Sequence, residues 1–131
     1  MATVTNQYPF AAPVYDIPEL DAGSDFLLGI QVLDGNGNPK DIRNSNVTLT
    51  AQIREDWNLP IVANFACIKD ATTISANQGN FTLSLGGNFS QSLVPTQQES
   101  PFKYDVLYVS PTSRQRLLQG NVSISGAITH V

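Results

Sequence analysis

Few side chains in this 131-residue chain could act as a nucleophile, a general base or a soft metal ligand. The one histidine, His130, is followed only by Val131, which is a poor position for the middle member of a Ser-His-Asp triad. The one cysteine, Cys67, alternates with Phe65 in an apolar stretch, and this favours a small buried side chain over a reactive thiol. One histidine and one cysteine also fall short of the ligand set of a zinc site. We therefore expect no enzymatic activity, no metal site and no cofactor.

One polar loop matches a calcium site in its first half only. Asp34, Asn36 and Asn38 occupy the first three ligand positions of an EF-hand loop. Pro39 then stands where that loop needs a glycine, and Ser45 stands where it needs a bidentate glutamate. The segment is therefore predicted to be a polar turn between strands.

Aromatic side chains offer a second kind of chemistry, the stacking of sugar rings. Phe102, Tyr104 and Tyr108 share one face of an expected strand, and at this spacing packing in the core is favoured. Trp57 follows two acidic residues in an expected turn, where it could contact a partner or a host glycan.

The first 22 residues show neither a strand period nor a helical period. Residues 8–18, YPFAAPVYDIP, hold three prolines, and proline removes a backbone donor, so this stretch should run extended or along a sheet edge. Two interpretations stay open: a first edge strand with a frayed terminus, or an arm that docks on a neighbouring subunit. We adopt the arm as the working hypothesis. Its candidate interface residues are Tyr8, Phe10, Val14, Tyr15 and Ile17, with Trp57 as a further contact.

From residue 25 onward, apolar residues recur with a period of two. Residues 25–33 and 46–54 alternate most clearly, and the turn-rich segment 34–41 separates them. Together they predict a hairpin with a long polar turn. In the second strand, Val47, Leu49, Ala51 and Ile53 are expected to face the core. In the first, Phe26, Leu28, Ile30 and Val32 share one face and Leu27, Gly29, Gln31 and Leu33 share the other, so this strand could be covered on both sides.

The rest of the chain continues the all-β pattern. Further strands are predicted at 61–68, 80–85, 102–110 and 114–125, with the last two forming a hairpin. A short strand is expected near 72–74, and one helical turn within 86–95. This series of short strands indicates a single immunoglobulin-like antiparallel β-sandwich at residues 23–131, with the extended N-terminal arm at 1–22.

Composition excludes several classes of function. Charged residues make up 14% of the chain and the net charge is −4, which argues against binding to nucleic acid through phosphate contacts. No apolar stretch approaches the roughly 18 residues that cross a bilayer, so no membrane association is expected. The N-terminal residues lack the basic and apolar regions of a secretory signal, which indicates synthesis in a cytoplasm.

Three segments carry a likeness to a known family. They are GSDFLLGIQVLDGNGNPKDI (23–42), VTLTAQIRED (47–56) and KYDVLYVSPTSRQRLLQGNVSIS (103–125). Their alternating strands, Asp-x-x-Gly turn with a proline and closing hairpin resemble the small immunoglobulin-like domains of phage upper-baseplate and fibre-adaptor proteins. The resemblance spans about four-fifths of the chain and does not extend to residues 1–22.

The resemblance implies a structural protein of a tailed phage virion, made in the bacterial host. Such a subunit would assemble in the tail or baseplate through contacts with other virion proteins and with copies of itself. Two alternatives stay open. One is a capsid decoration protein whose arm lies across capsid subunits. The other is a carbohydrate-binding module that contacts the host surface through Trp57 and exposed tyrosines.

Overall fold

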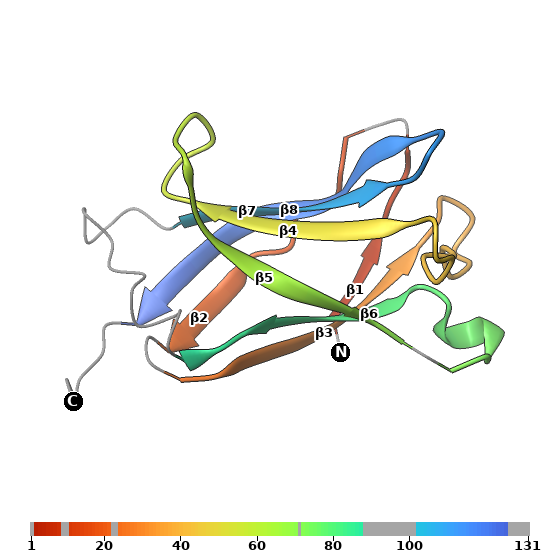
Figure 1. Ribbon diagram of the computed structural model, residues 1–131, viewed down its shortest axis with the longest axis horizontal. Coiled ribbons are helices and arrows are strands. Elements are labelled where there is room, and N and C mark those ends of the chain that lie inside the picture. The colour runs from red at the N-terminus through yellow and green to blue at the C-terminus, as the bar shows by residue number, and fades with distance from the viewer. Residues whose placement is uncertain (1, 9–10, 22–23, 71, 88–101, 126–131) are drawn as a thin grey trace.

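Two layers of strands face each other across a common core, and together they form one continuous eight-stranded sheet (Figure 1). The computed structural model describes residues 2–8, 11–21, 24–70, 72–87 and 102–125. Within them the one named helix is the 3-10 turn η1 (Ser75–Asn77), so the all-β prediction is confirmed. The strands are β1 (Ala2–Thr5), β2 (Ile17–Asp21), β3 (Phe26–Leu33), β4 (Thr48–Arg54), β5 (Ile61–Lys69), β6 (Asn80–Leu85), β7 (Phe102–Val109) and β8 (Arg114–Ser125).

Strand order along the sheet is β1-β3-β6-β5-β4-β7-β8-β2. We call β1, β3 and β6 the lower layer and β4, β7 and β8 the upper layer, after their places in Figure 1. β2 is counted with the upper layer because it pairs with β8. β5 belongs to both layers, because its first half pairs with β4 and its second half pairs with β6. The orders β3-β6-β5 and β4-β7-β8 are those of the B-E-D and C-F-G strands in an immunoglobulin-type sandwich.

The sheet is mixed, which differs from the purely antiparallel sandwich that was expected. β1 lies parallel to β3, and β2 lies parallel to β8. Both parallel strands come from the N-terminal segment and form the two ends of the strand order. Edge positions suit this segment, because Pro18 in β2 has no backbone N–H. A strand paired on the free side of β2 would lack a hydrogen-bond donor at this position.

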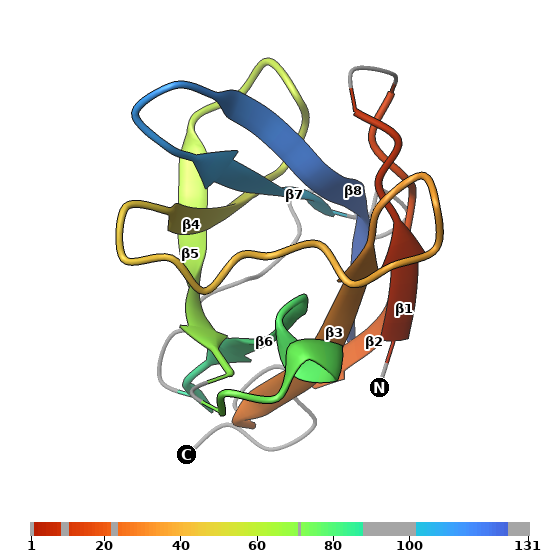
Figure 2. The ribbon, with the colours of Figure 1, turned by 90° about the vertical axis from the view of Figure 1, so that its right-hand side faces the viewer.

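The predicted hairpin of residues 25–54 is wrong, although both of its strands exist. β3 pairs with β1 and β6, whereas β4 pairs with β5 and β7. The connection between β3 and β4 crosses the end of the sandwich from one layer to the other (Figure 2). It is tied down by Ile42, which is fully buried and whose N–H donates to the Gln78 carbonyl at 3.0 Å.

The predicted inward faces are otherwise confirmed. Val47, Ala51 and Ile53 of the second strand are buried, and Leu49 packs against the core. The aromatic set of β7 is also in the core, as expected, with Tyr104 fully buried. Residues 72–74 form no strand, and the expected helical turn at 86–95 falls mainly outside the described residues.

A bulge in β8 places two consecutive leucines inside. Val106 pairs with Leu118 and Leu107 pairs with Arg116, so Leu117 is the extra residue. Leu117 and Leu118 are both fully buried. The bulge also interrupts the regular ladder at this point of β8, where backbone carbonyls need other partners.

In the described part of residues 1–22, β1 and β2 join the sheet, which differs from the expected arm outside the folding unit. Val4, Ile17 and Leu20 belong to the hydrophobic core. The Asn6 side chain is 3% exposed and donates to the carbonyls of Arg116 and Leu117 at 3.0 and 3.1 Å, at the bulge. The segment between β1 and β2 thus links the edge of the lower layer to the edge of the upper layer.

Candidate functional site

The expected interface residues of the N-terminal segment separate into two groups. Ile17 is 2% exposed and belongs to the core, and the partly buried Tyr15 packs against that core. Tyr8 and Val14 do face solvent, with exposed fractions of 55% and 67%. Phe10 lies outside the described residues.

The backbone of Tyr15 lies directly against β8 and is held there by hydrogen bonds. Its N–H donates to the Gln119 carbonyl at 2.8 Å, and its carbonyl accepts from the buried Tyr104 hydroxyl at 2.5 Å. A Cβ atom on Gly120 would lie 2.2 Å from the Tyr15 carbonyl oxygen. Glycine at position 120 therefore lets the N-terminal segment lie directly on β8.

Trp57 lies in the loop between β4 and β5, which stands out beyond the upper layer in both views (Figures 1 and 2). The Asp56 carboxylate accepts from the Trp57 N–H at 2.8 Å, and Arg54 donates to the Leu59 carbonyl at 2.8 Å. The Arg116 guanidinium lies 5.7 Å from the centre of a Trp57 ring, while the side chain stays 42% exposed. The loop thus presents an aromatic ring whose position is fixed by internal contacts.

β5 turns a row of uncharged side chains to solvent. Along the strand, Phe65 points into the core and is 4% exposed, while the alternate positions point outward. Four outward residues form what we call the β5 face: Val62, Asn64, Ala66 and Ile68. Val62 is 45% exposed and Ile68 is 55% exposed.

The exposed apolar side chains concentrate around this strand. Of nine large hydrophobic residues that are exposed in the described part of the chain, six lie on β5 or in the loops next to it. They are Trp57, Leu59, Ile61, Val62, Ile68 and Ile74. No charged residue occurs between positions 57 and 68. Single apolar side chains are normal on a protein surface, whereas contiguous apolar patches mark contact sites, so this strand and its loops are the candidate contact region.

Sequence reasoning found the strand and missed the surface. The segment IVANFACI is apolar at both sets of alternating positions, a pattern that is typical of a strand covered on both faces. The position of β5 at the side of the sandwich, where it passes between layers, leaves one of those faces uncovered. The informative feature of the sequence was the absence of charged residues from position 57 to position 68, because an exposed strand usually carries charged side chains.

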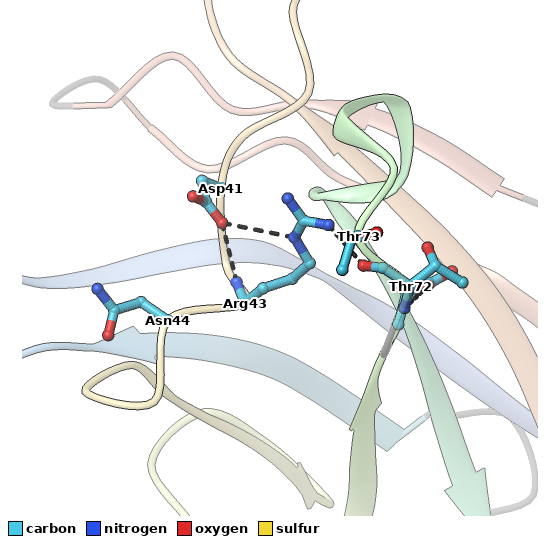
Figure 3. A pocket seen from close by; sticks show the side chains of 6 residues that line it. Asp41, Arg43, Asn44, Thr72 and Thr73 are labelled. Carbon is cyan, nitrogen blue, oxygen red and sulfur yellow. Dashed lines mark hydrogen bonds and ion pairs between the residues drawn. The ribbon is translucent and has the colours of Figure 1, made fainter.

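A shallow polar groove of about 470 Å³ lies between the β3–β4 connection and the loop that follows β5 (Figure 3). Its lining residues are Asp41, Arg43, Asn44, Asp70, Thr72 and Thr73. Arg43 Nη1 donates to the carbonyls of Thr72 and Ile74 at 2.6 and 3.2 Å. Its Nε lies 3.9 Å from an Asp41 carboxylate oxygen. These contacts hold the two loops together, so the arginine is occupied within the fold.

The acidic groups beside this groove are also used internally. Hydrogen bonds from the hydroxyl and the backbone N–H of Thr72 hold the pKa of Asp70 below its usual value. Asp34, from the loop tested as a calcium site, accepts from the N–H groups of Asn36 and Asn38 at 2.9 and 3.1 Å. Among the described residues no group of three or more histidine, cysteine, aspartate or glutamate side chains could hold a metal ion.

Cys67 is on the inward side of β5. It packs against the core, and burial raises the pKa of its thiol to about 12. The thiolate is the reactive form, so the environment makes this cysteine a poor nucleophile at neutral pH. This agrees with the expected small apolar role.

Comparisons with known proteins add no family to these observations. The chain matches no model of a known protein family, and a search of curated proteins finds no match. No helix in the described residues is long and apolar enough to span a membrane.

Proposed function

We propose that this protein is a structural subunit of a tailed phage particle, without enzymatic activity, that joins the tail or baseplate through protein contacts. One observation carries the proposal: the uncharged, apolar surface along β5 and its adjacent loops. Burying such a surface costs no desolvation of charge, and depletion of charged residues is typical of the centre of protein interfaces. The sandwich serves as a rigid support that holds this surface and the Trp57 loop in place.

The phage assignment is supported by the resemblance of residues 23–56 and 103–125 to small immunoglobulin-like baseplate and adaptor domains. Its partners would be other virion proteins and copies of itself, without a role for nucleic acid or membrane, and its location would be the virion. The polar groove is crossed by internal hydrogen bonds of Arg43, and Cys67 is partly buried against the core, so neither supports a different function.

The test is to find the protein in particles. Gold-labelled antibodies against the purified chain are applied to particles of the phage whose genome encodes it, with particles of an unrelated phage as the control. We expect label on the tail or baseplate. Label on the head would instead support the capsid decoration alternative, and absence of the chain from purified particles would refute both.

A second candidate function follows from the exposed ring of Trp57. Arg116 lies near this ring, and ligand sites commonly combine aromatic side chains with a few polar or charged groups. In a carbohydrate-binding module, host-surface glycans would quench the fluorescence of Trp57, the only tryptophan of the chain. Tyr8→Ala, which removes another exposed aromatic ring, is the matched control for Trp57→Ala. Saturable quenching by glycans in the natural chain and in Tyr8→Ala, together with loss of glycan binding in Trp57→Ala by titration calorimetry, would favour the module over the structural subunit.

A further inference from the structure

We infer that the outer face of the upper layer holds a binding site for an acidic saccharide next to the Trp57 loop. In this site the side chains of Arg54 and Lys103 bind the anionic group of the sugar, and the indole of Trp57 packs against the sugar ring. The inference rests on the carbohydrate-binding candidate above, because it names the chemical class of glycan that the surface around Trp57 takes.

Two cationic side chains stand directly opposite each other on this face. Arg54 of β4 pairs with Lys103 of β7 in the sheet register. The adjacent residues Ile53 and Tyr104 are fully buried, so Arg54 and Lys103 point to the outer face. Side chains at opposite positions of an antiparallel pair have Cβ atoms about 4.5–5.5 Å apart, and like charges there lower stability. An anionic ligand bound at the pair would relieve this repulsion.

In the described part of the chain, neither cation of the pair forms an ion pair. Arg54 donates from Nη2 to the Gln52 amide oxygen at 2.9 Å and from Nη1 to the Leu59 carbonyl at 2.8 Å. Lys103 donates from Nζ to the Asn121 amide oxygen at 2.6 Å. These acceptors are neutral, so they orient the two side chains without compensating their charges.

The carboxylates around the pair do not neutralise it either. Asp105 lies two residues from Lys103 on the same face of β7, but it is 8% exposed and its carboxylate lies 3.2 Å from Arg116 Nε. Glu55 follows Arg54 directly, and no ion pair joins these two side chains among the described residues. The chain has a net charge of −4 and only seven basic residues, so two adjacent cations without an acidic partner mark this face for an anion.

The Trp57 loop makes the site suitable for a sugar. Trp57 lies three residues beyond Arg54, and the hydrogen bond from Arg54 to Leu59 ties the loop to the end of β4. Arg116, whose guanidinium lies 5.7 Å from the centre of a Trp57 ring, connects the loop to Asp105 of β7. The exposed indole can pack against the apolar face of a sugar ring, which a free phosphate or sulfate ion does not offer.

The experiment measures the binding of oligogalacturonate to the full chain by titration calorimetry, with its methyl ester as the neutral counterpart. The two probes share one sugar backbone and differ in the charge of their carboxyl groups. We expect the acid to bind at least about tenfold more tightly than the ester, and to lose this advantage when NaCl is raised to about 1 M. Inorganic phosphate should bind more weakly than the acid, because it cannot pack on Trp57.

Variants of the full chain separate the charge of the pair from the ring. Lys103→Gln should weaken binding of the acid by about tenfold with little change for the ester, and Lys103→Arg, which keeps the charge, should restore most of the affinity. Arg114→Gln is the matched control, because Arg114 is an exposed cation that pairs with Val109 at the opposite end of the β7–β8 hairpin. Trp57→Ala should weaken the acid and the ester alike. Thermal unfolding checks that every variant keeps its fold.

Four results would overturn the inference: equal affinity for acid and ester, equal losses in Lys103→Gln and Arg114→Gln, phosphate binding as tight as that of the acid, or no measurable binding of the acid. Tighter binding of oligoglutamate than of the sugar acid would also overturn it and would assign the face to an acidic peptide.

These outcomes are separate from a failure of the functions proposed above. Binding of the ester that is lost in Trp57→Ala and unaffected by Lys103→Gln, with no preference for the acid, would keep the carbohydrate candidate and refute the anion site. Labelled particles together with a chain that binds no sugar would keep the structural role only.

Discussion

The two sides of the sandwich join its layers in different ways. On one side β5 passes from the upper layer to the lower layer as a single strand. On the other side β1 and β2 attach to separate layers, and the segment between them is held by side-chain contacts such as those of Asn6 with β8. The N-terminal side buries its apolar residues in the core, whereas the β5 side exposes apolar residues to solvent.

This difference reverses the expected roles of the two regions. The proline-rich N-terminal segment has the composition of an assembly arm, yet it supplies Val4, Ile17 and Leu20 to the core. β5 has the pattern of a covered strand, yet it leaves Val62 and Ile68 exposed. Composition indicates which residues prefer burial, and topology decides whether their own chain buries them.

The largest expected effect comes from deleting residues 1–22. The truncated chain loses both edge strands and three core residues, which at roughly 1.5–3 kcal/mol for each buried side chain approaches the whole stability of a small domain. We expect no cooperative unfolding transition in circular dichroism. A truncated chain that melts cooperatively near the temperature of the full chain would restore the arm hypothesis.

Gly120→Ala should act on the same side by a steric effect. The new Cβ would lie 2.2 Å from the backbone oxygen of Tyr15, so the N-terminal segment must move away from β8. We expect a loss of about 1–3 kcal/mol or more in the free energy of unfolding, measured with urea. Gly35→Ala is the control, since a Cβ there meets only Gln7 Cγ, at an ordinary contact distance of 4.0 Å. Equal stability of the two variants would mean that the segment does not lie on β8.

Asn6→Ala removes the two side-chain hydrogen bonds that link the N-terminal segment to the bulge of β8. The carbonyls of Arg116 and Leu117 then lose this donor in a buried site, at a cost of about 1–3 kcal/mol. Thr5→Ala, at the exposed neighbouring position, should change stability by less than about 0.5 kcal/mol. Similar losses of stability in both variants would mean that the effect comes from disturbing the strand and not from removing the hydrogen bonds of Asn6 to β8.

Strand positions were predictable from the sequence because alternation is a local property. The pairing of the strands was not, since β3 and β4 are neighbours in sequence but find their partners in distant segments. The N-terminal segment shows the same limit. Prolines exclude a central strand, and an edge strand such as β2 tolerates them as well as a free arm does.

The candidate surface was only partly predictable. Trp57 was expected at a contact surface; it is exposed, and its contact role stays a prediction. The β5 face could not be recognised, because a strand that is apolar on both sides does not show which side the fold leaves open. That choice depends on β5 lying where the sheet passes from one layer to the other.

On the β5 side, polar substitution should cost little stability. Ile68→Ser is expected to change the free energy of unfolding by no more than about 0.5 kcal/mol. Leu83→Ala on the adjacent β6 is the contrast, because Leu83 is fully buried and its truncation should cost about 2–5 kcal/mol. A large loss in Ile68→Ser would place this side chain inside the core.

The smallest effect at neutral pH, and the one that reports most directly on which way β5 faces, concerns Cys67. Burial raises the pKa of its thiol to about 12 in the folded chain, above the usual value of about 8.5 that the unfolded chain should show. Between these values the unfolded chain has released the proton and the folded chain has kept it. The free energy of unfolding should therefore stay level below pH 8 and fall as the pH rises above about 9. Tyr104, whose pKa burial also raises, contributes a fall of the same sign at higher pH. The difference in pH dependence between the natural chain and Cys67→Ala isolates the contribution of the cysteine.

A thiol reagent tests the same assignment directly. Ala66→Cys in the Cys67→Ala background places the thiol on the outward side of β5, where the reagent at pH 8 should label it rapidly. Cys67 of the natural chain should react only after unfolding. Equal labelling rates at the two positions would show that the inward and outward sides of β5 have been assigned wrongly.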